Sequence, residues 1–125
     1  MTYIYLAIFA VLGAFARYGQ TLVVQGIAGR DFPWATLSIN VLGSFLMGFL
    51  FFETLERVSV SPQLRTGILT GGLGAYTTFS TFSLETVNLL ESGEAWKGVL
   101  YIVSSVVLSL VAALFGAYLS RNMGV

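Results

Sequence analysis

A run of glycines, threonines and phenylalanines, GGLGAYTTFSTFS, occupies residues 71–83 inside an uncharged stretch of the chain. A membrane helix would normally carry leucine and valine there, because backbone leaves the helix in lipid only where it is buried in protein or lines water. The glycines weaken the helix, and Thr77 and Thr78 can satisfy freed backbone groups. We therefore expect a broken helix whose carbonyl oxygens suit a hard cation such as Na⁺ or K⁺. The alternative is an unbroken helix with a glycine-rich packing face.

Two phenylalanines within this run can serve an anion. Phe79 and Phe82 are three residues apart, so they share one helical face. The edge of a phenyl ring is electropositive, and ring edges turned toward a narrow pore would favour an anion without a fixed charge. Ordinary packing is the alternative, since the chain has ten phenylalanines. Glu85 lies three residues beyond Phe82, and either a vestibule or a surface ion pair suits it.

Polar side chains recur at helical spacing in two other apolar tracts: Tyr101, Ser105 and Ser109, and Thr36, Asn40 and Ser44. Bonding back to their own backbone would explain the individual hydroxyls. It explains Asn40 poorly, because a carboxamide has two donors and two acceptor lone pairs to satisfy. Arg17 is the one basic residue in the interior of a predicted span, since Arg65 and Lys97 are each the third residue of theirs. It can snorkel to the nearer surface, or it can pair with an acid or line a vestibule.

These residues offer hydrogen-bond donors, and no lysine lies in the interior of a span. That suits a small, strongly hydrated ion that must exchange water for protein donors and still leave. The chain lacks the residues that other functional classes of protein require. The chain has no histidine and no cysteine, which removes the commonest metal ligand and proton shuttle and all thiol chemistry. No nucleophile–base pair, phosphate loop or basic run is visible. We expect neither an enzyme nor a nucleic-acid-binding protein.

The composition places these residues in a membrane. Apolar residues make up 56% of the chain and charged residues 10%, against about 25% charged residues in soluble domains. Four tracts approach the roughly 20 residues that span a bilayer. We predict an all-α membrane protein with a single transmembrane domain over residues 1–125 and spans at about 3–24, 33–52, 63–90 and 95–119. The short linkers carry helix stops at Gly26 and Gly29, a turn glycine at Gly93, and helix starts at Pro33 and Ser61–Pro62.

Positive charge is nearly balanced between the two predicted membrane faces. An even number of spans places both termini and the middle loop on one side. That side carries Arg57, Arg65 and Arg121, and the other carries Arg30 and Lys97. So small a difference gives almost no orienting bias. We predict dual topology, with copies inserted both ways; a single weakly biased orientation is the alternative.

Dual topology permits an antiparallel homodimer. Small residues stand where helices can approach closely, from Gly13 to Gly19 in the first span and from Gly43 to Gly48 in the second. Such residues favour helix association in membranes, and two-fold dimers are the commonest oligomers. Four short helices also leave little room for a pore inside one subunit.

The chain resembles the Fluc (CrcB) family of bacterial fluoride channels over essentially its whole length. The resemblance is carried by GGLGAYTTFSTFSLE in the third span, SINVLGSFLMG around Asn40, and GAFARYG in the first span. It implies a dual-topology antiparallel homodimer in the bacterial inner membrane, with two fluoride pores and a structural Na⁺ at the dimer centre. It also implies a passive channel that exports F⁻ from the cytoplasm and confers fluoride resistance.

The same resemblance implies residue roles. The backbone carbonyls of Gly74 and Thr77 would hold the Na⁺. Asn40 would donate its amide to fluoride, and Phe79 and Phe82 would meet the ion with their ring edges. The remaining implied residues are the polar track of the last helix, two further pathway candidates, a vestibule acid and a cation near an aqueous opening: Tyr101, Ser105 and Ser109; Ser80 and Thr81; Glu85; and Arg17.

Two other functions compete with the channel. A small dual-topology multidrug exporter needs a buried carboxylate to exchange protons for cations, and the first span contains no acid. A membrane assembly factor without transport is the third possibility. Against it stands the free-energy cost of placing Asn40 and a helix break in lipid without a pathway.

Overall fold

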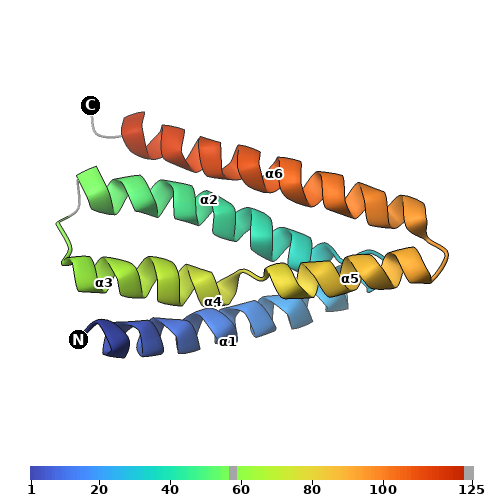
Figure 1. Cartoon of the computed structure of the whole chain (residues 1–125), viewed down its shortest axis with the longest axis horizontal. Coiled ribbons are helices and arrows are strands. Elements are labelled where there is room, and N and C mark those ends of the chain that lie inside the picture. Colours follow the sequence, from blue (N-terminus) through green and yellow to red (C-terminus); the bar gives the residue numbers. More distant parts are fainter. Residues whose placement is uncertain (57–58, 123–125) are drawn as a thin grey trace.

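The computed structural model describes residues 1–56 and 59–122 and forms an all-α bundle with four passes (Figure 1). The start of the first pass and the end of the last one lie at one end of the bundle, where the second pass also ends and the third begins. The predicted class of four helices with a broken third one is confirmed. Arg57, which entered the charge balance, lies outside the described residues. The elements are α1 (Thr2–Ala28), α2 (Trp34–Glu56), α3 (Pro62–Thr66), the π-helix η1 (Gly67–Leu73), α4 (Gly74–Tyr76), α5 (Phe79–Glu91) and α6 (Ala95–Asn122).

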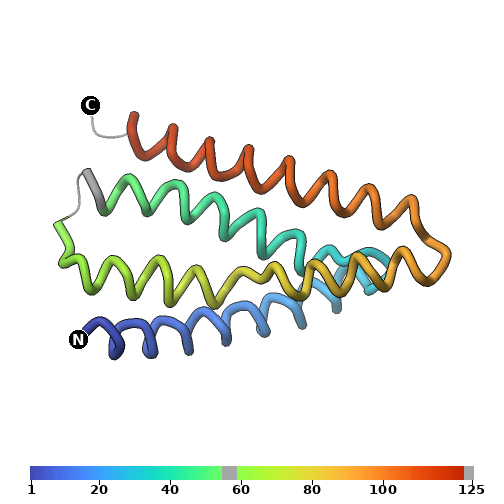
Figure 2. Tube along the Cα trace, viewed as in Figure 1, coloured from blue at the N-terminus to red at the C-terminus, as the bar shows by residue number. Residues whose placement is uncertain are grey.

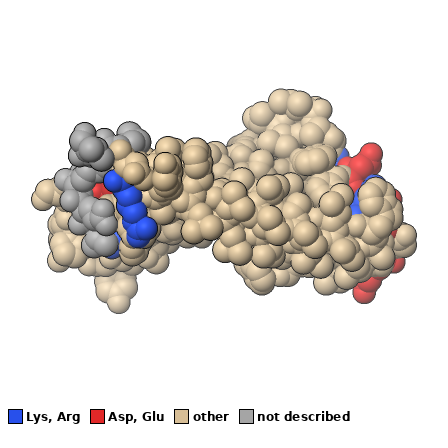
Figure 3. All heavy atoms as spheres, turned by 90° about the horizontal axis from the view of Figure 1, so that it is seen from above, with Lys and Arg blue, Asp and Glu red and all other residues tan. Residues whose placement is uncertain are grey.

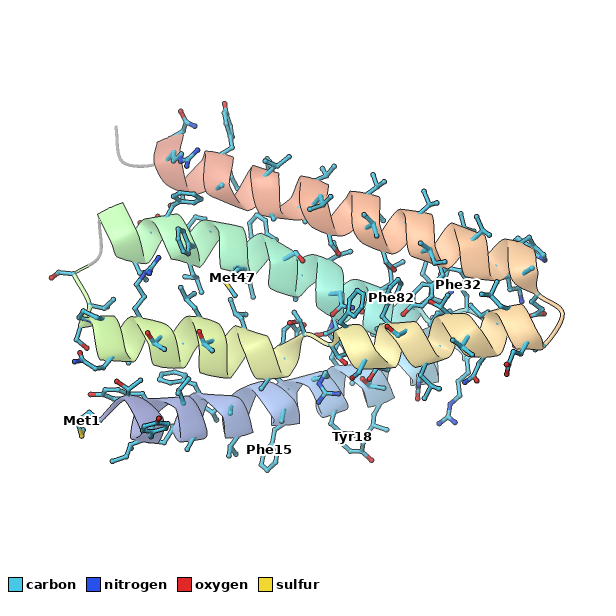
Figure 4. All side chains as sticks on the ribbon, in the orientation of Figure 1. Met1, Phe15, Tyr18, Phe32, Met47 and Phe82 are labelled. Atoms are coloured by element: carbon cyan, nitrogen blue, oxygen red, sulfur yellow. The ribbon has the colours of Figure 1, made fainter. Side chains whose placement is uncertain are left out.

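Three of these helices are long and apolar enough to cross a membrane: Thr2–Ala28, Trp34–Thr54 and Ala95–Asn122. Their apolar side chains point outward. Phe15 and Tyr18 are 73% and 67% exposed, and Figure 4 shows both projecting from α1 away from the other helices. On the face shown in Figure 3, charged side chains gather at the two ends and leave an uncharged middle. Lipid is the solvent that such a surface needs, so the chain is a multi-pass membrane protein, as predicted.

The third pass consists of helical pieces and a break (Figure 2). Helical backbone continues from Pro62 to Tyr76. Thr77 (φ −83°, ψ 162°) and Thr78 (φ −151°, ψ 120°) are then extended, and α5 begins at Phe79. The unbroken helix considered as an alternative is therefore wrong. The interruption falls on the two threonines, whereas the preceding glycines stay helical.

Those glycines serve close packing against α1. A Cβ placed on Gly71 would lie 2.8 Å from the Leu6 carbonyl oxygen, and one on Gly13 would collide with the carbonyl of Gly72. Only glycine permits two backbones to approach this closely. We expected Gly19 in the same role, but a Cβ placed there would meet no atom within 4 Å, so its face of α1 is open.

The second and last passes are also joined through glycine. A Cβ on Gly116 of α6 would lie 2.8 Å from the Phe49 nitrogen of α2, and Gly48 faces the Ala113 carbonyl. Buried apolar residues form two clusters, one on each side of the break: Ile39, Leu69, Leu73 and Tyr76, and Leu37, Phe82 and Tyr101. Because α2 contributes to both clusters, it spans the break as a continuous support.

The helix ends follow the predicted signals except at Gly26, because α1 continues through it to Ala28. Ser61 caps α3, because its hydroxyl accepts a hydrogen bond of 3.1 Å from the Leu64 nitrogen and Pro62 follows as the first helical residue. Gly29 and Gly93 have φ of 79° and 82°, a region that favours glycine. They turn the chain after α1 and after α5.

Candidate functional site

Threonine hydroxyls provide hydrogen-bond partners to backbone groups at the break in the third pass. Thr77 donates its hydroxyl and its amide to the Leu73 carbonyl, at 2.9 and 3.0 Å. Thr78 caps α5, because its hydroxyl accepts from the Thr81 nitrogen at 3.2 Å. The threonines therefore satisfy backbone groups at the break, as the sequence predicted. They also end one helix and begin the next.

Asn40 of α2 holds the break from the side. Its Nδ2 donates to the Thr78 carbonyl at 3.0 Å, and its Oδ1 accepts from the Thr78 nitrogen at 2.9 Å. The carboxamide therefore pairs with one residue as a neighbouring β-strand would. This pairing occupies one amide hydrogen of Asn40 and leaves the second free. Asn40 is thus a structural partner of the break as well as a possible donor to an ion.

Two side chains of α1 hold the other side of the break. Arg17 donates from Nε to the Ala75 carbonyl at 3.1 Å. Gln20 accepts a hydrogen bond from the Tyr76 hydroxyl and donates to Ser38 of α2 at 3.1 Å. This polar chain links the first, second and third passes. Gln20 and Tyr76 were not among the predicted site residues, although Arg17 and Gln20 share a face of α1 at a spacing of three, which was a usable signal.

A cavity of about 460 Å³ lies beside the break, between α2, α5 and α6. It brings together six predicted residues, which contribute one carboxamide, three hydroxyls and two phenyl rings. No charged residue lines it. The lining residues are Asn40, Gly43, Ser44, Met47, Leu73, Thr77, Thr78, Phe79, Phe82, Ser105, Val106, Ser109, Leu110 and Ala113. The surface offers hydrogen-bond donors within an otherwise apolar wall.

Ser105 gives this cavity its clearest unused polar group. The side chain is 7% exposed, and its Oγ is the one buried side-chain polar atom in the described part of the chain that has no hydrogen-bond partner. A buried hydroxyl without a partner costs free energy, so the position favours a ligand that accepts a hydrogen bond. Ser109 lines the same cavity one turn further along α6.

The two predicted pore phenylalanines differ in exposure. Phe82 is buried, at 9% exposed, and packs on Tyr101 with ring centroids 5.0 Å apart; Figure 4 labels it in the space between α5 and α6. Phe79 is 77% exposed although it lies at the middle of the third pass. Their centroids are 5.5 Å apart. Phe82 is therefore fixed by packing within this chain, whereas Phe79 faces outward.

Tyr101 separates this cavity from a second one. Its ring is fully buried and its hydroxyl donates to Glu85 at 2.8 Å. Glu85 lines a cavity of about 410 Å³ at the end of the bundle where Arg30 and Asp31 lie. Phe32 meets the Tyr101 ring edge-on at 5.6 Å. Tyr101 thus contacts Phe82 on one side and Glu85 on the other, and it does not line the larger cavity itself.

Besides Arg17 and Tyr101, three predicted residues line neither cavity. Ser80 is exposed, with its hydroxyl 3.4 Å from that of Thr78. Thr81 accepts from the Thr78 hydroxyl at 3.1 Å. Gly74 is exposed at the start of α4. The structure therefore places these residues around the break on its outward side.

Comparisons with known proteins extend over nearly the whole chain. The family model described as CrcB-like protein, Camphor Resistance (CrcB), matches residues 4–117. The chain is 71% identical over 121 residues to a fluoride-specific ion channel FluC of Acidithiobacillus ferrooxidans, with 97% of each chain covered. It is 48% identical to the protein of that name from Magnetococcus marinus, with 94% of this chain and 95% of the relative covered. For the Geobacter sulfurreducens relative of that name the identity is 43%, and 98% of each chain is covered.

Proposed function

The chain belongs to the CrcB family, and on that basis we propose that it is a fluoride-selective channel that passively carries F⁻ out of the cytoplasm and confers fluoride resistance. The relatives compared above are named fluoride-specific ion channels, so the function is transport and not an enzymatic reaction. An inside-negative membrane potential expels an anion with about 2.3 kcal/mol per unit charge per 100 mV. Passive flow therefore suffices for export.

The observation that carries this proposal is the uncharged cavity beside the break. Fluoride is small and strongly hydrated, so it must exchange water for protein donors before it can pass. The free amide hydrogen of Asn40 and the unpaired hydroxyl of Ser105 are such donors. The ring edges of Phe79 and Phe82 add positive potential without a fixed charge that would hold the anion. Tyr101 and Glu85 then lie between this cavity and the second one, which Glu85 lines.

The working channel in this proposal is an antiparallel homodimer with dual topology and two pores. The exposure of Phe79 and Gly74 at the middle of the third pass supports a covering partner there. A two-fold axis near the break would bring Phe79 of each subunit to the other and would repeat the cavity twice. Single-molecule photobleaching in vesicles should show two subunits per channel; a single bleaching step throughout would exclude the dimer.

A structural Na⁺ at the dimer centre fits the backbone at the break. Within the described residues, no hydrogen bond reaches the carbonyl oxygens of Gly74 or Thr77, whereas the neighbouring carbonyls of Leu73, Ala75 and Thr78 all accept one. Free carbonyl oxygens are suitable ligands for a hard monovalent cation. When bound, the ion would hold two subunits at one point and supply positive potential.

Efflux from liposomes tests the function directly. Vesicles containing the purified protein and loaded with fluoride should release F⁻ at a rate that rises with protein content, as read by a fluoride electrode. Matched vesicles loaded with chloride should retain it. Absence of fluoride release, or equal release of chloride, would reject the proposal. Proton-coupled uptake of organic cations by the same vesicles would instead support the multidrug exporter.

A further inference from the structure

Arg17 carries a charge within the first pass, and the part of the chain that the structure describes gives that charge no counterpart. The side chain is half-buried, and no carboxylate within the described residues lies at salt-bridge distance from it. It lines neither of the two cavities. Its described contact is the hydrogen bond from Nε to the Ala75 carbonyl, at 3.1 Å. The expected position at an aqueous opening therefore finds no support from its neighbours.

The target of that hydrogen bond lies immediately before the break. In a continuous helix the Ala75 carbonyl would accept from the amide of Phe79. Because Thr77 and Thr78 are extended, this bond is lost and the carbonyl needs another donor. A carbonyl left unpaired away from water costs free energy. Arg17 supplies the missing donor from α1, opposite to Asn40, which supplies donor and acceptor to Thr78 from α2.

We propose that Arg17 is a positioning residue of the channel, which holds the break open through its Nε–H bond to the Ala75 carbonyl, and that its positive charge is not what the channel requires. The proposal rests on the proposed fluoride channel function. Arg17 and Asn40 then grip adjacent parts of the break from two sides. Together they determine which carbonyls are engaged and leave those of Gly74 and Thr77 free.

Side-chain geometry separates the hydrogen bond from the charge. The Nε2 of glutamine is the same number of bonds from Cα as the Nε of arginine, so Arg17→Gln keeps an N–H donor in place and removes the charge. Lysine has a methylene at that position and carries its ammonium one bond further, so Arg17→Lys keeps the charge and misplaces the donor. Arg17→Met removes both. Arg121→Gln is the matched control, because Arg121 is exposed at the end of α6 with its guanidinium 3.9 Å from the Phe52 ring centroid.

Fluoride efflux from liposomes should rank these variants by donor and not by charge. We expect Arg17→Gln and Arg121→Gln to stay within about threefold of the wild type, and Arg17→Lys and Arg17→Met to lose about tenfold or more. An anion-attracting role gives the opposite order, with flux retained by Arg17→Lys and lost by Arg17→Gln. That order, or equal flux in all variants, would overturn the proposal. Arg17→Gln by itself distinguishes the donor role from the anion-attracting role. The proposal can therefore still be overturned if Arg17→Lys and Arg17→Met fail to fold.

Hydrogen–deuterium exchange gives a readout that does not depend on transport. Amides of the segment that contains Thr77 to Phe82 should exchange faster in Arg17→Met and Arg17→Lys than in the wild type, and at the wild-type rate in Arg17→Gln. Unchanged exchange in Arg17→Met would contradict the positioning role. If the wild-type protein carried no fluoride, the proposed function would fail while the exchange experiment would still test Arg17.

Discussion

The two halves of the third pass are held by different means. Before the break, the pass lies against α1 with backbones almost in contact, because Gly13 faces Gly72 and Gly71 faces Leu6. After the break, α5 meets α6 through rings and a hydroxyl, with Phe82 on Tyr101 and Tyr101 on Glu85. The first half is therefore held by contacts that leave no room for a side chain at these glycines. The second half presents functional groups to the cavity. Substitutions in the two halves should accordingly fail in different ways.

The largest expected effect lies in the second half. Phe82→Ile should lower fluoride efflux about a hundredfold, equivalent to about 2.7 kcal/mol in the barrier, because isoleucine has no electropositive ring edge. Phe79→Ile should act in the same direction. The protein should still assemble, as size-exclusion chromatography can check. Phe15→Ile is the control, since Phe15 faces lipid on α1; wild-type flux in both pore variants would show that the rings only pack.

In the first half, packing should fail before transport is tested. Gly13→Ala should lower the free energy of unfolding by about 2 kcal/mol, because the new methyl group overlaps the Gly72 carbonyl. Gly19→Ala on the same helix meets nothing within 4 Å, so stability should stay or rise by up to about 1 kcal/mol. Denaturant unfolding in detergent measures both. Equal stability of the two variants would contradict the close contact.

Asn40 pairs with Thr78 at the break between the two halves, and its substitution should affect transport moderately. Asn40→Asp replaces the Nδ2 donor by an oxygen, so the Thr78 carbonyl loses its partner and faces another acceptor. We expect fluoride efflux to fall about tenfold, or about 1.4 kcal/mol. Asn122→Asp at the exposed end of α6 makes the same chemical change away from the break. Normal efflux in Asn40→Asp would exclude the amide from the route.

The smallest effect concerns the polar chain that connects Tyr76 through Gln20 to α2. Tyr76→Phe removes the hydroxyl that donates to Gln20, at a cost of about 1 kcal/mol in stability. Fluoride efflux should change little, because Tyr76 lines neither cavity. Tyr18→Phe, on the outward face of α1, should leave stability unchanged. A large loss of flux with normal stability in Tyr76→Phe would give this polar chain a direct part in conduction.

The sequence predicts those features of the fold that bilayer thickness determines, namely the number and length of the spans. The four apolar tracts became four passes, because a span of about 20 residues satisfies its own backbone in lipid. The break was foreseen from the composition of residues 71–83, but its place was not. Glycine weakens a helix in isolation, whereas here α1 presses on Gly71 and Gly72 and keeps them helical. That outcome depends on a neighbour far away in the sequence, which local composition does not contain.

The residue types of the candidate site could be predicted from the sequence, but their hydrogen-bond partners could not. Asn40, Phe82 and Ser105 were identified because a carboxamide, a paired aromatic face and a hydroxyl stripe are unusual in a span, and all three line the cavity. The bonds from Asn40 to Thr78 and from Arg17 to Ala75 were not foreseen. They join different helices, and the relative rotation of those helices is set by packing that no single span encodes.

A planar bilayer with a tenfold fluoride gradient at constant chloride tests the selective channel most directly. A passive fluoride-selective pore reverses its current about 59 mV from zero at 25 °C, with the sign of the fluoride gradient. With a tenfold chloride gradient and equal fluoride on both sides, the current should reverse at zero. A reversal potential at zero in the fluoride gradient, or one that follows chloride, would contradict a fluoride route beside the break.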